Sequence, residues 1–443
     1  MGADRVGFRD ESHIKVWIFL FNLKGSAAAS QTTTDNNDVV LQHIHKDQGL
    51  FFLLWVRGRE ERRSPLRFFT SFSPDQDFPK GKLERYDKGV KQSLFPAQSL
   101  TAGHWFKLIC GASFQHLPAI RDLTLVYSLV GADCIDVAAD PAVVTMAQES
   151  LIQAEAIARQ NPAKFPQWQG KPWLMISLND AEDPHFRKAF FNPNRCPADC
   201  PRPCETVCPA LAIDHTGVIG DRCYGCGRCL PICPLGLIEA KNYISSPHIA
   251  AEMITTMAID AVEIHTQAGH FADFQRLWQT LKPVHHHLKL LAISCQDHPD
   301  VLSYLEQLLI EIQPLDCLLL WQTDGRPMSG DIGKGTIHAS IQFAQKVLQS
   351  GLPGYVQLAG GTNNHTFDKL RHLGLLNEGR SPFIAGVAFG GYARKILQPI
   401  LENAVEMQPQ PLESDPERFD QAIAHATQLI NPLKSSLNPS LSL

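Results

Sequence analysis

The sequence lacks three features that would assign it to a common class. No run reaches the roughly 18 apolar residues that a membrane span needs. Positive charge is not in excess, because the formal net charge is −5 and the pI about 6.4, so nucleic acid binding through bulk charge is not expected. Cysteines are not spread as in a small secreted disulfide scaffold. Of the 12, eight fall between Cys196 and Cys233, which indicates metal ligation within a chain of 443 residues.

Residues 1–93 differ from the rest of the chain, because neither helical nor strand periodicity persists in them. We therefore expect a disordered N-terminal extension. The apolar run Val16–Leu23 is similar to the core of a secretory signal peptide, but the run is short and Lys24 follows it. We favour an extension outside the fold, consistent with an upstream start codon, and a cytoplasmic protein.

From Trp105 onward, short apolar runs alternate with longer amphipathic stretches. Such strands, separated by helices, predict an α/β fold with a parallel sheet covered on both faces. Eight repeats predict closure into a (β/α)8 barrel, and an open doubly wound sheet is the alternative. The expected strands are Trp105–Cys110, Cys134–Ala138, Trp173–Leu178, Ala261–His265, Leu288–Ser294, Cys317–Gln322, Gly354–Leu358 and Ile384–Ala388.

A block from Phe191 to Tyr243 interrupts this alternation between the third strand and its helix. It divides the barrel into residues 94–190 and 244–407, with an insertion at 191–243 and a tail at 408–443 that holds one helical stretch near Pro416–Leu429. Strand-to-helix loops lie on the carboxyl-end face of a barrel, where active sites are built. We therefore expect the insertion to lie over or beside the barrel mouth.

The second cysteine run has the spacing Cys223-x2-Cys226-x2-Cys229-x3-Cys233-Pro234. This spacing matches the bacterial ferredoxin pattern for a [4Fe–4S] cluster, in which the fourth cysteine binds a second cluster. Three thiolates two residues apart can wrap one cubane. A zinc ribbon would instead use two well-separated knuckles, so iron–sulfur is favoured over zinc.

The first run, Cys196-x3-Cys200-x3-Cys204-x3-Cys208-Pro209, also ends in Cys-Pro, but its early spacings are one residue longer. The cross-ligation rule predicts a ferredoxin-like α+β module with two [4Fe–4S] clusters. One would be held by Cys196, Cys200, Cys204 and Cys233, and the other by Cys208, Cys223, Cys226 and Cys229. The wider spacing leaves open a labile or incomplete first cluster. The remaining cysteines (Cys110, Cys134, Cys295 and Cys317) are expected to pack as small hydrophobes.

Glycine pairs follow the last two expected strands. At these positions, backbone amides can approach a phosphate at a helix N-terminus, which is a recurrent barrel site. Flavin mononucleotide (FMN) or another phosphate-bearing ligand would fit there, and ordinary tight turns are the alternative. The candidate binding residues are Gly360, Gly361, Asn363, Gly390, Gly391 and Arg394.

Further polar residues are expected at the mouth without an assigned catalytic role: Asp136, Asn179, His265, Asp324 and Arg326. By contrast, the triplet His285–His287 precedes a strand and belongs to the opposite end of the barrel, where a solvated turn is expected.

The runs CPADCPRPCETVCPA and CYGCGRCLPICP, with FPAQSLTAGHWFKLICGASFQHLPAIRDL and DGRPMSGDIGKGT, resemble the light-dependent period (LdpA) family of cyanobacterial proteins. The resemblance spans roughly residues 94–407. It implies an iron–sulfur protein that senses cellular redox state, with circadian clock input proteins as partners and the eight cysteines as functional residues.

Two classes of function follow. The first is a redox sensor whose clusters equilibrate with photosynthetic electron carriers or the quinone pool. The second is a flavin-dependent oxidoreductase that passes electrons between the clusters and a substrate in the barrel mouth. The residues leave open whether the chain is an enzyme.

Overall fold

A computed structural model describes five short strands within residues 4–54, together with residues 95–242, 246–325, 337–377, 379, 382–402 and 410–434. The chain divides into two compact units, Met1–Gln76 and Asp77–Leu443.

The first unit contains only short antiparallel pairings among its described residues. β1 (Asp4–Val6) pairs with β2 (Ile18–Leu20). A second sheet has the order β3 (Ala28–Ser30), β4 (Leu41–Lys46) and β5 (Gly49–Leu54). The sequence shows no persistent strand periodicity in this segment, so these short strands are not expected from it. The disorder expected for residues 1–93 stays a prediction, and most of that segment lies outside the described residues.

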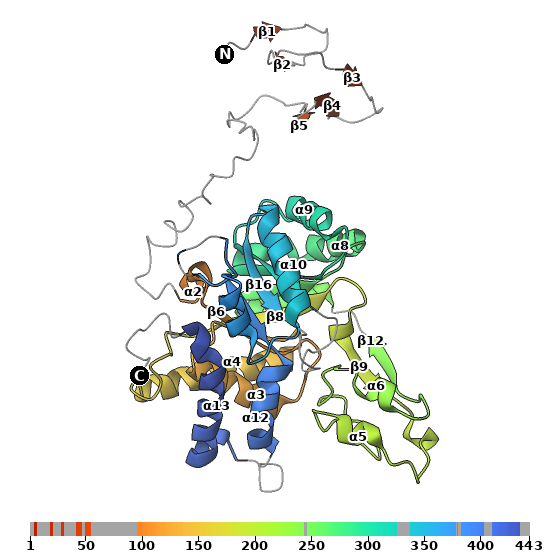
Figure 1. The fold of residues 1–443 in the computed structure, drawn as a ribbon, viewed down its shortest axis with the longest axis vertical. Coiled ribbons are helices and arrows are strands. Elements are labelled where there is room, and N and C mark those ends of the chain that lie inside the picture. The colour runs from red at the N-terminus through yellow and green to blue at the C-terminus, as the bar shows by residue number, and fades with distance from the viewer. Residues whose placement is uncertain are drawn as a thin grey trace. The chain divides into compact units, whose positions relative to one another are not determined.

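The second unit confirms the predicted (β/α)8 barrel (Figure 1). Eight parallel strands close in the order β13-β14-β15-β16-β17-β6-β7-β8. The strands are β6 (Trp105–Gly111), β7 (Cys134–Ala138), β8 (Trp173–Asn179), β13 (Ala261–His265), β14 (Leu290–Gln296), β15 (Leu318–Asp324), β16 (Tyr355–Ala359) and β17 (Gly386–Phe389). Every expected strand is present, with ends shifted by up to two residues.

Helices surround the barrel at the expected places: α3 (Leu117–Leu129), α4 (Pro141–Gln160), α7 (Pro247–Thr256), α8 (Phe271–Leu281), α9 (Val301–Glu311), α10 (Ile337–Ser350), α11 (Thr366–His372) and α12 (Gly391–Glu402), preceded by α2 (Ala97–Ala102). Local chemistry sets their starts. In α4, the Asp140 carboxylate accepts hydrogen bonds from the amides of Ala142 and Val143, and Pro141 occupies the first turn.

The last helix, α13 (Pro416–Lys434), covers the stretch that the sequence analysis placed in a tail. It packs against α3 and α12 and buries Phe419, Leu429 and Ile430. Lys434 Nζ lies 2.5 Å from Asp133 Oδ2, just before β7. The helix therefore belongs to the outer layer of the barrel.

The barrel interior changes character along its axis. At the amino-end, Trp105, Trp173, Leu290 and Leu320 pack as an apolar layer. Toward the carboxyl ends, buried positions are polar or charged, including Lys107, Asp136, Glu263, Gln322 and Gln357. Buried charges are costly unless they are paired, so this half of the barrel is arranged around a polar network.

The insertion forms a small module that projects from the barrel (Figure 1). Its stem pairs β9 (Arg187–Phe190) antiparallel with β12 (Glu239–Asn242), so pairing begins four residues before the expected boundary. Between them lie α5 (Pro203–Val207), the hairpin β10 (Ile213–Asp214) and β11 (Gly217–Val218), and α6 (Cys229–Ile232). The 3-10 turns η1 (Pro184–Phe186) and η2 (Pro193–Arg195) flank β9. Among the described residues, no helix is long and apolar enough to span a membrane.

Candidate functional site

The inserted module has its own hydrophobic core, and cysteines are part of it. Cys204 and Cys229 are buried with Phe191, Ile213 and Ile238. All eight cysteines of the two runs are free thiols. A module this small needs a further stabilising element, and metal ligation by its thiolates would supply one.

The thiols fall into two groups that mix the two runs. Cys229 interacts electrostatically with Cys223, Cys226 and Cys208. Cys196 interacts instead with Cys200 and Cys233, and Cys204 also interacts with Cys233. In each group, the last cysteine of one run joins three from the other. This is the arrangement that cross-ligation requires.

The chemistry of the donors fits iron–sulfur clusters. Burial raises the pKa of the Cys229 thiol to about 12, so its thiolate requires a bound metal to be stable there. Backbone amides donate to sulfurs in both groups: Ala189 N to Cys223 Sγ (3.4 Å), Ala212 N to Cys208 Sγ (3.3 Å) and Leu237 N to Cys233 Sγ (3.4 Å). Such bonds to sulfur tune cluster potentials. Each group has at least one.

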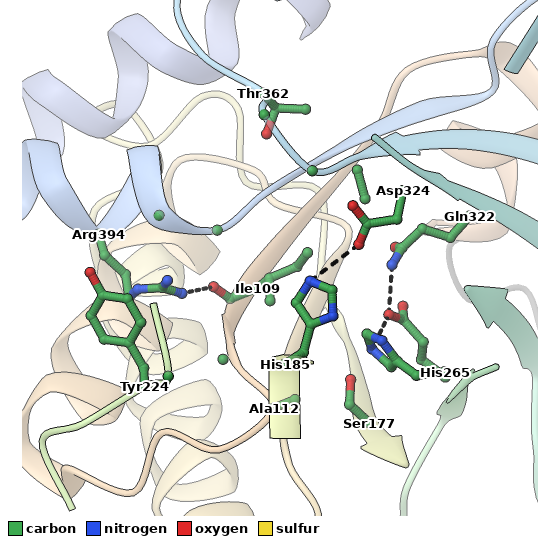
Figure 2. Close-up of a pocket in the computed structure, with 18 of the residues that line it drawn as sticks. Ile109, Ala112, Ser177, His185, Tyr224, His265, Gln322, Asp324, Thr362 and Arg394 are labelled. Carbon is green, nitrogen blue, oxygen red and sulfur yellow. Dashed lines mark hydrogen bonds and ion pairs between the residues drawn. The ribbon is translucent and has the colours of Figure 1, made fainter. Parts of the chain in front are cut away.

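A cavity of about 80 Å³ lies at the carboxyl ends of the barrel strands (Figure 2). One water molecule needs roughly 10–15 Å³, so the cavity has room for several waters or a small anionic group. Its walls combine the two glycine loops with residues of the inserted module. They include Gly360, Gly361, Thr362, Gly390, Gly391, Arg394, Tyr224, Gly225, His185, Glu263, His265, Gln322 and Asp324.

Tyr224 joins the cysteine module to the barrel. The Arg394 guanidinium stacks over its ring, 4.2 Å from the centroid, and Figure 2 shows the two side by side. Phe114 contacts the same ring edge-on, with centroids 5.8 Å apart. Arg394 Nη1 also donates to the carbonyls of Ile109 and Cys110 at 2.8 Å. Because Tyr224 follows Cys223, the loop that carries Cys223 lies against the cavity.

A buried charge network forms the floor of the mouth. Lys107, the third residue of β6, pairs with Asp136 at 3.2 Å and with Glu263. Burial opposes the charge on Lys107, but the two carboxylates outweigh it and raise the lysine pKa. Burial raises the pKa of Asp136 to about 6, whereas Lys107 and His265 overcome burial and lower that of Glu263 to about 2. Gln322 Nε2 donates to Glu263 Oε1 at 2.6 Å.

Two histidines face each other above this network, with ring centroids 5.1 Å apart. His185 Nδ1 lies 2.8 Å from Asp183 Oδ1, and its Nε2 lies 3.3 Å from Asp324 Oδ2. His265 Nε2 lies 2.8 Å from Glu263 Oε1. Burial lowers the pKa of His185, but Asp324 and Asp183 outweigh it and raise the pKa to about 9.

Five of the six predicted binding residues line this one cavity, although the two loops are thirty residues apart in sequence. They meet because β16 and β17 are neighbouring strands. Asn363 is the exception. Its amide donates to Gly361 O and its carbonyl accepts from His365 N, so it stabilises its own loop.

Of the other polar residues expected at the mouth, only some line the cavity. His265 and Asp324 line the cavity. Asp136 lies below it within the barrel, where Ser177 Oγ donates to its carboxylate at 2.7 Å. Asn179 donates to Ala181 O. Arg326 lies outside the described residues. The triplet His285–His287 forms the turn η3 before β14, at the opposite end of the barrel as expected.

Sequence reasoning missed several residues of the mouth. Lys107 and Glu263 carried a usable signal, because each is a lone charge within an otherwise apolar expected strand. Gln322 and Gln357 are similar but weaker cases. Asp183, His185 and Tyr224 carried none, because they lie in loops whose path depends on the module and the barrel together.

Comparison with known proteins agrees with this architecture. Residues 196–244 match a family model described as the LdpA Fe-S cluster-binding domain, and residues 253–432 match the light dependent period A C-terminal domain. The chain is 53% identical over 343 residues to "Light dependent period A" of Synechococcus elongatus, covering 77% of this chain and 95% of the relative. The matched cluster-binding domain contains all eight clustered cysteines, so the chain is an iron–sulfur protein.

Solved structures are much less similar. Ribulose-1,5-bisphosphate carboxylase/oxygenase from Pyrococcus horikoshii is 10% identical with a TM-score of 0.34, covering 80% of this chain and 66% of that one. N-acetylneuraminate lyase from Mycoplasma synoviae is 9% identical with a TM-score of 0.27, covering 75% and 87%. Neither similarity bears on function.

Proposed function

Because the chain belongs to the light dependent period A family, we propose that it is a redox sensor that relays light-dependent redox state to the circadian clock of a cyanobacterium. One observation carries the proposal. Eight free thiols form two cross-run groups within one module, and the loop of one group rests on a pocket of the barrel. We propose two [4Fe–4S] clusters, with the cysteine assignment given above.

The clusters would supply one-electron chemistry that changes local charge with little rearrangement. The residues of the chain determine where that charge is felt. Tyr224 and Gly225 lie between Cys223 and Cys226, and Tyr224 stacks on the Arg394 guanidinium. A charge change beside this cation would alter its attraction to the ring and to the Ile109 carbonyl. The barrel mouth is therefore the surface expected to respond to redox state.

The partners follow from the same proposal. Electrons would come from photosynthetic carriers or the quinone pool, and clock input proteins would bind the redox-sensitive surface. We place these encounters in the cytoplasm. Neither nucleic acid nor a membrane span is part of the proposal.

The first test is Cys226→Ser in protein purified without oxygen. Because Cys226 belongs to the Cys208 group, the variant should lose the electron paramagnetic resonance (EPR) signal of that cluster and keep the other. Cys317→Ser is the matched control, since Cys317 lies outside the module, and it should keep both signals. Binding of a clock input protein should change between reduced and oxidised wild type and lose this dependence in Cys226→Ser. Equal binding in both redox states would refute the sensor.

A second function is favoured by the composition of the cavity. We propose as the alternative a flavin-dependent oxidoreductase, in which FMN or another phosphate-bearing ligand binds the glycine loops. Gly360, Gly361 and the start of α12 line the cavity there, and Arg394 offers positive charge beside the loop of the Cys208 group. The cavity fits a phosphate-sized group, so the remainder of such a ligand would extend beyond it.

This alternative has its own test. Denatured wild type should release yellow, fluorescent flavin if the oxidoreductase proposal holds. Gly361 has φ +80°, so Gly361→Val should distort the loop, abolish FMN binding followed by fluorescence quenching, and spare both clusters. Absence of flavin, together with redox-dependent partner binding, would favour the sensor.

A further inference from the structure

The mouth of the barrel also holds a cluster of metal-ligating side chains outside the cysteine module. Asp183, His185 and His265 each place one donor atom within 4.8 Å of the other two. The three come from two elements. Asp183 is the N-cap of the turn η1 after β8, His185 lies within that turn, and His265 ends β13, the neighbouring strand. We propose that they form a mononuclear site for a divalent first-row transition metal.

The distances fit one ion. Asp183 Oδ1 lies 2.8 Å from His185 Nδ1 and 3.8 Å from His265 Nδ1. Ligand bonds of about 2.1 Å at tetrahedral or octahedral angles separate donor atoms by about 3.0–3.4 Å. Both distances to Asp183 lie within a few tenths of an ångström of this range, and the two histidine donor atoms lie within 4.8 Å of each other, so small side-chain rotations would bring all three atoms onto one metal.

The outer partners of the two histidines are those expected of metal ligands. A metal-bound histidine usually donates its other ring N–H to a carboxylate, which fixes its orientation. His185 Nε2 faces Asp324 Oδ2 at 3.3 Å, and His265 Nε2 faces Glu263 Oε1 at 2.8 Å. Each ring thus has one nitrogen on a carboxylate and the other toward Asp183. Figure 2 shows the two rings side by side, with His185 directed at Asp324.

Ligand type and access narrow the choice of metal. Two imidazoles and one carboxylate suit Fe²⁺, Mn²⁺, Co²⁺ or Zn²⁺ rather than Mg²⁺ or Ca²⁺, which prefer oxygen ligands throughout. Asp183 and His265 are buried, whereas His185 is partly exposed, and both histidines line the cavity. Three protein ligands leave coordination positions open toward that cavity, as in catalytic rather than structural sites.

The site shares no ligand residue with the two cysteine groups, so one experiment can measure the metal content of both. We would dialyse the full chain, clusters intact and without oxygen, against Co²⁺ and measure cobalt, iron and acid-labile sulfide. Wild type should bind one cobalt per chain without losing iron. Asp183→Asn and His265→Gln should each abolish stoichiometric cobalt binding and keep iron and sulfide. Asp324→Asn should weaken cobalt binding about 10–100-fold, because Asp324 only orients His185.

The matched control is the pair His286→Gln and His287→Gln, because these exposed histidines lie at the other end of the barrel. Wild-type cobalt binding in this control supports the site. The proposal would be overturned if the control lost its cobalt or if wild type bound no stoichiometric cobalt. It would also be overturned if both Asp183→Asn and His265→Gln bound cobalt as well as wild type does. Thermal unfolding gives a second readout: Co²⁺ should raise the melting temperature of wild type and of the control, but not of His265→Gln.

Discussion

Gly225→Ala should release the loop of the Cys208 group from the barrel. Gly225 has φ +74°, a left-handed conformation that costs an L-residue roughly 1–2 kcal/mol. A Cβ built at this position would lie 2.3 Å from the carbonyl oxygen of Arg187, against 3.4 Å for ordinary contact. The obstacle is backbone of β9, which the stem pairing holds in place. The loop must therefore move by about 1 Å.

The size of the effect can be separated into its two causes. Overpacking of this kind costs typically 1–3 kcal/mol, so the total is about 2–5 kcal/mol. Gly236, which follows Cys233, has φ +60° and nothing within 4 Å of a built Cβ. Gly236→Ala therefore has only the backbone cost, and it is the matched control. The difference between the two variants isolates the close approach to Arg187.

The assay is the rate at which a chelator removes iron from protein kept without oxygen. The two variants differ by the overpacking cost of about 1–3 kcal/mol, and 1.36 kcal/mol corresponds to tenfold in rate. Gly225→Ala should therefore lose iron from one cluster about 5- to 150-fold faster than Gly236→Ala. The Arg187 guanidinium, which donates to Gly225 O at 3.2 Å, should lose this bond. Equal rates in the two variants would refute the argument that the loop is fixed by contact with β9.

Further predictions concern the barrel itself. Lys107→Met should destabilise the protein by about 3–5 kcal/mol, because it removes the buried cation that pairs with the carboxylates of Asp136 and Glu263. Lys164→Met, which removes an exposed ion pair, should cost about 1 kcal/mol or less in the same urea titration, and equal losses would contradict the network. Asp140→Ala should cost about 0.5–2 kcal/mol by removing the N-cap of α4, and an unchanged midpoint would contradict that role.

The sequence predicts the barrel well because short apolar runs alternate regularly with amphipathic stretches along the chain. All eight strands are buried on both faces, so each reads as a short apolar run, and proline and N-cap residues mark helix starts. The glycine loops could be assigned to one pocket for a related reason: consecutive parallel strands end at the same rim. Both predictions can be made from local sequence patterns and the order of the strands along the chain.

The polar half of the mouth could not be predicted in the same way. His185 and Asp183 belong to a short turn before the module, and nothing in their local pattern indicates that His265 and Asp324 lie beside them. Tyr224 reaches Arg394 only because the module folds back onto the rim. These contacts join segments far apart in the chain, and local periodicity carries no information about them.

We propose that this chain holds redox-active iron–sulfur clusters in its cysteine module. It is tested most directly by iron and acid-labile sulfide analysis of the full chain purified without oxygen, combined with an EPR redox titration. We expect iron and sulfide close to two [4Fe–4S] clusters per chain, with spectra that change reversibly on reduction and reoxidation. Zinc in place of iron, with no acid-labile sulfide, would contradict it.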